Sequence, residues 1–235
     1  MIASLHLADV GTRAALRLSP RRLELTKVPG MRYAEIAITA PLSANLISKP
    51  NLGRVALIAT WEDESALEDF LARHTLAERL AHGWRVRLQP MRIFGRWPPL
   101  DGLVTQEQPM DDDEPAAALT IGRLRLSQAM RFFRATAKAE ALAIGEPSLS
   151  ASTGLARPPA LVGTFSLWKS TAAMRAYVEG KSRPAHSSAV QAHAAKPYHH
   201  ESAFVRFRPY ASEGEWDGRD PLAETPGPAV GSSRG

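Results

Sequence analysis

The chain has 235 residues, of which 44% are hydrophobic, 23% are charged and none is cysteine. This composition excludes wholesale disorder, and the length suits one large domain or two small ones. The lack of cysteine excludes disulfides, thiolate metal sites and a cysteine nucleophile. No apolar run approaches the roughly 18 residues of a transmembrane helix, and no basic leader precedes the first strand. We therefore expect a cytoplasmic protein with no transmembrane segment.

The basic residues are spread along the chain rather than clustered. Lysine and arginine exceed acidic residues by 29 to 24, for a net charge of +5. The densest stretch contains Arg85, Arg87, Arg92 and Arg96, which fall on a predicted strand. A nucleic-acid surface usually combines a basic stripe with interleaved aromatic residues. We expect no nucleic-acid partner.

The first hundred residues show the order strand, helix, strand, strand, helix, strand. Strands are predicted at 3–9, 33–39, 54–61 and 84–94, and helices at 12–25, interrupted at Pro20, and at 62–74. Residues 101–116 follow and are polar, with an acidic run at 111–114. We interpret residues 1–100 as one folded half and residues 101–116 as a solvated acidic linker.

The same order of elements recurs in residues 117–216. Strands are predicted at 118–126, 148–155, 160–168 and 203–210, and helices at 127–144, with Ser127 as its N-cap, and at 169–181. Residues 217–235 are rich in Gly, Pro and Ser and are predicted to be a disordered tail.

The two halves look like copies of one unit. Apolar residues follow Trp61 and Trp168 at the same offsets: Leu67, Phe70 and Leu71 in the first half, and Met174, Tyr177 and Val178 in the second. The order βαββαβ is that of ferredoxin-like folds. We predict an α+β protein in which two tandem ferredoxin-like halves pack as one intrachain barrel with the helices outside.

The second half is the longer copy. Trp216 lies 48 positions after Trp168, whereas Trp97 lies 36 positions after Trp61, and the enlarged stretch holds His186, His193, His199 and His200. None of these has a familiar metal-ligand spacing, so we expect no histidine metal cluster. A haem iron needs only one neutral imidazole. The asymmetry points to the second half as the one that carries a site.

Spaced residues in both halves resemble the spheroidene monooxygenase family. In the second half they are 164–168, Met174, His186-x-x-Ala189, Tyr198-x-x-Glu201-x-x-Phe204-x-Arg206-Phe207 and Gly214-x-Trp216-x-Gly218; in the first half they are Val28-Pro29-Gly30, 56–61 and Gly95-x-Trp97. The resemblance implies a haem protein related to the dimeric α+β-barrel proteins. It also implies monooxygenase action on an apolar, carotenoid- or terpenoid-like molecule, with dioxygen and an external reductant. A ferredoxin-type protein is the candidate electron donor.

The resemblance also assigns candidate site residues. His186 becomes the candidate axial ligand of the haem iron, and hence the metal-binding and catalytic residue. Arg206, Phe204 and Tyr198 become candidate cofactor-binding residues. From the residues alone, a polar surface residue is the favoured reading of His186, and a solvated strand face explains Arg206 and Arg208 as well as a haem contact does. The region around His186 is rich in Ser and Ala, which departs from the family pattern.

Several alternatives stay open at this point. One is a cofactor-free barrel monooxygenase, and another is a non-catalytic, degenerate barrel that only binds a ligand. The chain is expected to be a monomer or a homodimer. A location at a membrane surface is the alternative to a freely diffusing cytoplasmic protein.

Overall fold

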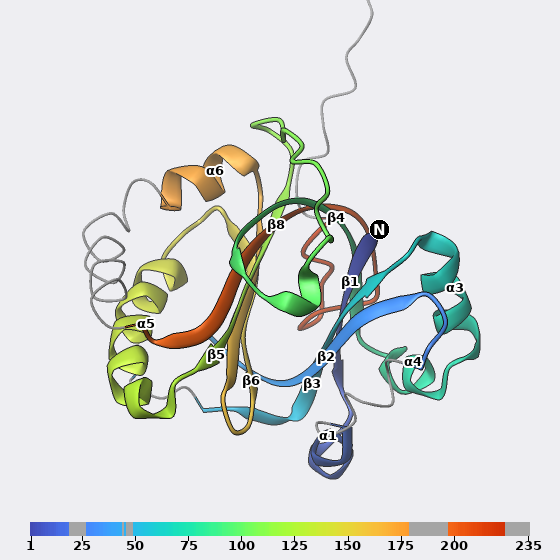
Figure 1. The fold of residues 1–235 in the computed structure, drawn as a ribbon, viewed down its shortest axis with the longest axis horizontal. Helices are drawn as coiled ribbons and strands as arrows, with labels where there is room; N and C mark the ends of the chain where they lie inside the picture. Colours follow the sequence, from blue (N-terminus) through green and yellow to red (C-terminus); the bar gives the residue numbers. More distant parts are fainter. Residues whose placement is uncertain (19–26, 44, 46–48, 179–196, 224–235) are drawn as a thin grey trace, which may run out of the picture.

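The computed structural model describes residues 1–18, 27–43, 45, 49–178 and 197–223, and its strands form one closed antiparallel barrel (Figure 1). The strands are β1 (Ile2–Asp9), β2 (Met31–Ala40), β3 (Asn51–Trp61), β4 (Trp84–Arg96), β5 (Ala116–Leu124), β6 (Leu149–Arg157), β7 (Leu161–Trp168) and β8 (His199–Glu213). The helices are α1 (Thr12–Leu18), α3 (Glu64–Arg73), α4 (Thr75–Leu80), α5 (Ala129–Ile144) and α6 (Thr171–Ala176), with 3-10 turns η1 (Pro98–Leu100) and η2 (Leu126–Gln128).

The barrel confirms the predicted fold of two ferredoxin-like halves. Its strand order is β1-β3-β2-β6-β7-β5-β8-β4. The first half therefore contributes the sheet β4-β1-β3-β2, and the second half contributes the equivalent sheet β8-β5-β7-β6. The two sheets join at β2–β6 and at β4–β8. Helices α3 and α4 lie outside one side of the barrel, and α5 and α6 lie outside the opposite side (Figure 1).

Matching N-caps confirm that the halves repeat the same local structure. Asp63 lies two residues after Trp61 and accepts a hydrogen bond from the Ala66 N–H at 3.0 Å. Ser170 lies two residues after Trp168 and accepts one from the Ala173 N–H at 3.1 Å. Each cap satisfies a backbone donor that the first turn of a helix leaves unpaired.

The predicted N-cap of the long helix in the second half was wrong. Ser127 lies inside the 3-10 turn η2, and Gln128 precedes the first residue of α5. Gln128 makes no side-chain cap bond there; its Oε1 instead accepts from Arg131 at 2.8 Å. The strand before the turn ends at Leu124, two residues earlier than predicted, so the chain has room for the extra turn.

The start of the predicted disordered tail is anchored on the barrel instead. Trp216 packs against Trp84 with ring centroids 5.3 Å apart. Asp220 accepts hydrogen bonds from the Trp84 indole at 2.9 Å and from Ser212 at 2.6 Å. The Trp84 indole N–H lies at the edge of the core and needs a hydrogen-bond acceptor there, and the Asp220 carboxylate is a strong one. Residues 224–235, like residues 19–25 of the predicted first helix, lie outside the described residues.

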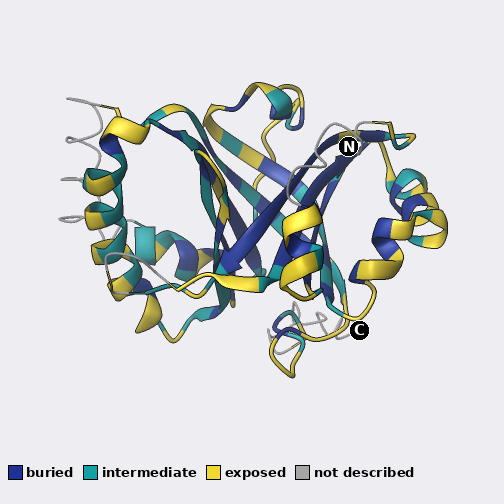
Figure 2. Ribbon diagram, turned by 90° about the horizontal axis from the view of Figure 1, so that it is seen from below, coloured by how far each residue is buried: buried dark blue, intermediate teal, exposed yellow. Residues whose placement is uncertain are grey.

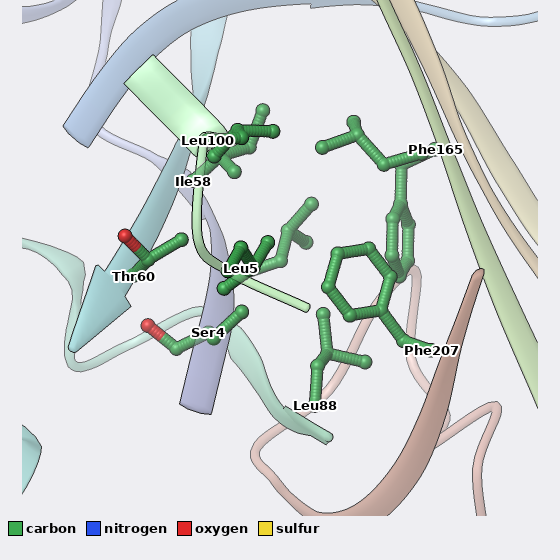
Figure 3. Close-up of a pocket in the computed structure, with 11 residues that line it drawn as sticks. Ser4, Leu5, Ile58, Thr60, Leu88, Leu100, Phe165 and Phe207 are labelled. Atoms are coloured by element: carbon green, nitrogen blue, oxygen red, sulfur yellow. The ribbon is translucent and has the colours of Figure 1, made fainter. Parts of the chain in front are cut away.

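The inside of the barrel is filled by apolar side chains. A cavity of about 10 Å³ lies among residues that include Leu5, Phe165 and Phe207 (Figure 3). That volume corresponds to about one water molecule, whereas pockets for small-molecule ligands typically measure about 300–1,000 Å³. This cavity is therefore far too small for an organic substrate.

A network of polar side chains inside the barrel crosses the β2–β6 junction, one of the two seams where the sheets of the halves join. Glu35 of β2 is completely buried and forms an ion pair with Arg157 of β6. The Tyr33 hydroxyl donates to Glu35 at 3.2 Å, and the Trp97 indole donates to the Tyr33 oxygen at 3.2 Å. A buried charge is stable only with a partner. This network of side chains therefore stabilises the contact between the two halves.

Candidate functional site

The outer faces of the two sheets carry different side chains. Alternate residues of a strand point into or out of a barrel. On β5, Leu119 and Ile121 belong to the barrel core, so Thr120 and Gly122 point outward. We use "platform" for the outward residues in the middle of the second-half sheet: Ala118, Thr120 and Gly122 of β5, Ser152 and Gly154 of β6, Val162, Thr164 and Ser166 of β7, and Ser202, Phe204 and Arg206 of β8.

The strand register makes the platform continuous across four strands. Two of its rows consist of Phe204, Thr120, Thr164 and Gly154, and of Arg206, Ala118, Ser166 and Ser152. Only Phe204 and Arg206 are larger than valine, and both lie on β8. The platform is thus a surface of small side chains with an aromatic ring and a cation along one side.

The described residues leave the centre of the platform uncovered. Thr120 lies on a central strand, yet it is exposed, and its neighbours Thr164 and Ser166 are half-buried. Thr164 lies four residues before Trp168 and pairs with Thr120. In the first half, Leu57 lies four residues before Trp61 and pairs with His6. His6 and Leu57 therefore match Thr120 and Thr164. Their exposed fractions are 2% and 0%. One half has therefore filled its outer face, and the other has left it open.

Helix packing explains this difference. In the first half, Leu67 and Phe70 of α3 are buried in a cluster with outward residues such as Leu57 and Trp61. In the second half, α5 buries only Ala143. Figure 2 shows buried faces on α3 and α4, whereas most of α5 is intermediate or exposed. The long helix therefore lies outside the second sheet without sealing its face.

Contacts near both ends hold α5 in place. Near its start, the Phe132 ring meets the His199 ring edge-on, with centroids 5.1 Å apart. Near its end, Glu140 accepts a hydrogen bond from the Ser43 N–H at 2.7 Å, and the Ala139 carbonyl accepts one from the Tyr177 hydroxyl at 3.1 Å. Burial raises the pKa of Glu140, and the bond from Ser43 partly offsets that rise. The helix is thus anchored at its ends, while the described residues do not pack tightly against its middle.

Two of the predicted cofactor-binding residues lie side by side on the platform. The Arg206 guanidinium lies 5.7 Å from the centre of the Phe204 ring and 5.3 Å from that of Phe94. Both Arg206 and Phe204 are half-buried. Arg208, the other arginine of this face, is engaged elsewhere, because its Nε donates to Glu114 at 2.9 Å. Glu114, the last residue of the acidic run that we predicted to be solvated, thus forms an ion pair with Arg208.

The remaining predicted site residues are not brought to the same place. Tyr198 lies just before β8, where it is buried; the Arg131 guanidinium lies 4.5 Å from its ring centre. Its ring also contacts Phe132, at a centroid distance of 6.1 Å. Tyr198 therefore helps to seat the start of α5. His186 lies outside the described residues.

His199, a histidine of the enlarged stretch to which we assigned no role from the sequence, lies beside the platform. Strict alternation along β8 from Phe207 would turn His199 inward. A bulge after the Arg123–Glu201 pair instead places His199 opposite Leu124 and reverses its face. A Cβ atom at Gly122 would lie 2.6 Å from Cδ2 of the His199 ring. The imidazole thus rests on the strand where Gly122 leaves room for it.

His6, the buried histidine of the first half, differs from His199 in its surroundings. His6 is held beneath α3, with Nε2 3.0 Å from the Ser4 hydroxyl and its ring edge-on to Phe70. Burial, together with the nearby charges of Arg85 and Arg87, lowers the pKa of His6 to about 3. His6 is a neutral core residue with no access to a ligand.

The platform leaves room for a planar group that carries an anionic edge. The small side chains allow close approach, Phe204 offers an aromatic contact, and Arg206 offers a cation to a carboxylate. His199 supplies an imidazole on the same face. Within the described ranges, no three His, Asp or Glu side chains converge to hold a metal ion by themselves. A haem group, which needs one axial imidazole, fits these residues.

Known proteins similar to this chain include curated spheroidene monooxygenases. It is 33% identical to that of Rubrivivax gelatinosus over 196 residues, which cover 81% of this chain and 73% of the relative. It is 30% identical to that of Rhodobacter capsulatus over 188 residues, covering 74% of each chain. No protein-family model matches the chain.

Solved structures support the fold. An aldoxime dehydratase structure matches with a TM-score of 0.50 at 11% identity, covering 96% of this chain and 88% of the other. At that identity the likeness establishes the barrel architecture alone. Among the described residues, no helix is both long and apolar enough to cross a membrane.

Proposed function

The chain belongs to the spheroidene monooxygenase family of oxidoreductases, and from this premise we propose that it is a haem-dependent monooxygenase whose haem lies on the platform. Its substrate would be an apolar molecule of the carotenoid or terpenoid type, oxidised with dioxygen and an external reductant. The relatives carry the name of a carotenoid, spheroidene. The proposed substrate class follows from those names.

The observation that carries the haem proposal is the uncovered centre of the platform. An exposed threonine in the middle of a central strand, flanked by half-buried threonine and serine, is unusual beneath a helix layer. The matching face of the first half is fully packed. A planar group would bury the small side chains of the platform and use Phe204 and Arg206 at its edge.

Each residue then has a separate role. Phe204 and the small side chains would bind the apolar surface of the macrocycle, and Arg206 would pair with a propionate. His186 remains the proposed axial ligand, and His199 is a second imidazole that could hold iron or orient a ligand beside it. Tyr198 would act through α5, as a positioning residue. Bound haem supplies the activation of dioxygen, while the protein binds, orients and excludes water.

Isotope incorporation tests this function. Protein reconstituted with haem is given an acyclic carotenoid in micelles, a ferredoxin with its reductase and NADPH, and ¹⁸O₂. The expected product gains ¹⁸O, detected by mass spectrometry. His186→Ala is expected to abolish incorporation, and His82→Ala, at an exposed first-half position, to leave it unchanged.

Two results would count against the proposal. Incorporation at the full rate by protein free of haem would favour the cofactor-free monooxygenase instead. Full activity of both His186→Ala and the double variant His186→Ala/His199→Ala would exclude these imidazoles as iron ligands. If only the double variant is inactive, His199 replaces His186 as ligand and the platform assignment stands.

A further inference from the structure

The outer side of α5 and the turn before it form an apolar and cationic surface. Nine large hydrophobic side chains are exposed among the described residues, and four of them lie here. Their exposed fractions are 63% for Leu126, 52% for Met130, 39% for Leu142 and 57% for Ile144. We call this the α5 surface, and it also includes Arg134 and Lys138. Exposed apolar side chains that gather on one element mark an interaction site more often than scattered ones do.

Helical spacing places the cations among these apolar residues. Met130, Arg134 and Lys138 follow one another at intervals of four and so share one face of α5. Arg134 and Lys138 are both exposed, and neither forms an ion pair within the described part of the chain. The only acidic residue of α5 is Glu140, which is half-buried and bonded to the Ser43 N–H. The exposed charge of the helix is therefore purely positive.

This combination fits an anionic lipid surface. Interfacial helices pair apolar side chains, which enter the headgroup boundary, with Lys and Arg, which meet anionic lipids. A second copy of the chain would bring like charges together at Arg134 and Lys138, which disfavours self-association. We infer that the α5 surface docks the protein on an anionic bilayer.

The position of α5 adds a consequence for ligand access. The helix lies at one end of the long axis of the molecule, outside the strands that carry the platform (Figure 1). Docking through α5 would bring the platform next to the bilayer, where apolar molecules are stored. The docking itself does not rest on the proposed haem chemistry, so the two can fail separately.

The absence of cysteine allows a direct test with single labels. Met130→Cys and Ile144→Cys are labelled with an environment-sensitive NBD dye, and Leu16→Cys serves as a matched control because Leu16 is 58% exposed on α1. Haem-free protein is mixed with vesicles of phosphatidylcholine containing 30% phosphatidylglycerol. We expect a blue shift and brighter emission at positions 130 and 144, none at position 16, and none with pure phosphatidylcholine.

Charge and apolar contributions can then be separated. Arg134→Gln/Lys138→Gln is expected to weaken vesicle binding roughly 30-fold, about five-fold for each cation, and 0.5 M salt should act in the same direction. Absence of a dye response at positions 130 and 144 would overturn the inference, as would an equal response at position 16. A response without vesicles that grows with protein concentration would show that a second copy covers this surface, which also overturns it.

Discussion

His6 and Thr120 occupy matching places in the two halves, and their surroundings are opposite. His6 is packed beneath α3 and stays neutral, whereas Thr120 is exposed on the platform. The difference comes from the residues around them. Leu57 and Phe70 fill the space beside His6, while a threonine, Thr164, takes the place of Leu57 beside Thr120. The side chains on each sheet and the helix that packs on them together decide which face is core and which is open.

The low pKa of His6 predicts an acid-sensitive stability. Folded His6 remains neutral down to about pH 3, while an unfolded histidine titrates near 6.5. Below pH 6.5 the unfolded state therefore binds one more proton, and the free energy of unfolding falls as the pH drops, by on the order of 1 kcal/mol per pH unit. Urea unfolding at pH 7 and pH 4.5 measures this loss. His6→Gln should show a smaller loss, and His82→Gln should match the parent chain; an identical loss in His6→Gln would contradict this account.

At the scale of elements, periodicity predicted most strands and helices but not their irregularities. The apolar segments that end at Trp61 and Trp168 form strands with many buried residues. Their hydrophobic patterns therefore predicted these strands. The bulge at the start of β8 has no pattern of its own, because it depends on pairing with β5. Strict alternation therefore gave no sign that His199 faces outward. The openness of the platform also depends on how far α5 lies from the sheet, which no local pattern records.

The bulge makes a specific prediction about Gly122. Gly122→Ala would place a methyl group 2.6 Å from the present position of the His199 ring, so the ring must move. Since the contact involves a side chain rather than backbone, we expect a loss of stability below about 1 kcal/mol. Haem affinity and the absorption maximum of the bound form should nevertheless change. Gly145→Ala, where a Cβ atom meets nothing within 4 Å, is the control. Unchanged spectra in Gly122→Ala would show that His199 is remote from the ligand.

At the scale of the whole molecule, the barrel depends on its two seams. Sequence repetition predicted two equivalent halves, and closure into one barrel followed from pairing their exposed sheet edges. The β2–β6 seam is short, running from Ile38–Ala156 to Ala40–Gly154. The buried pair of Glu35 and Arg157 reinforces it. That pairing could not be predicted, because the two residues are far apart in the chain and nothing in either strand pattern marks an inward charge.

Removing one partner of this pair should destabilise the entire barrel. Arg157→Met leaves Glu35 buried without its cation, which typically costs about 3–5 kcal/mol. Chemical denaturation followed by tryptophan fluorescence and by circular dichroism should give one coincident, shifted transition. The double variant Glu35→Gln/Arg157→Met is expected to recover part of the loss. A single variant as stable as the parent chain would show that the pair contributes nothing to the seam.

Haem titration of the purified protein tests the central claim, that the open outer face of the second half is a cofactor site. We predict a Soret shift that saturates at one haem per chain. Thr120→Leu/Thr164→Leu, which gives the platform the kind of apolar side chains that fill the first half, should abolish the shift while the protein remains folded by circular dichroism. A chain that shows no Soret shift, or a double variant that binds haem as well as the parent, would contradict the account.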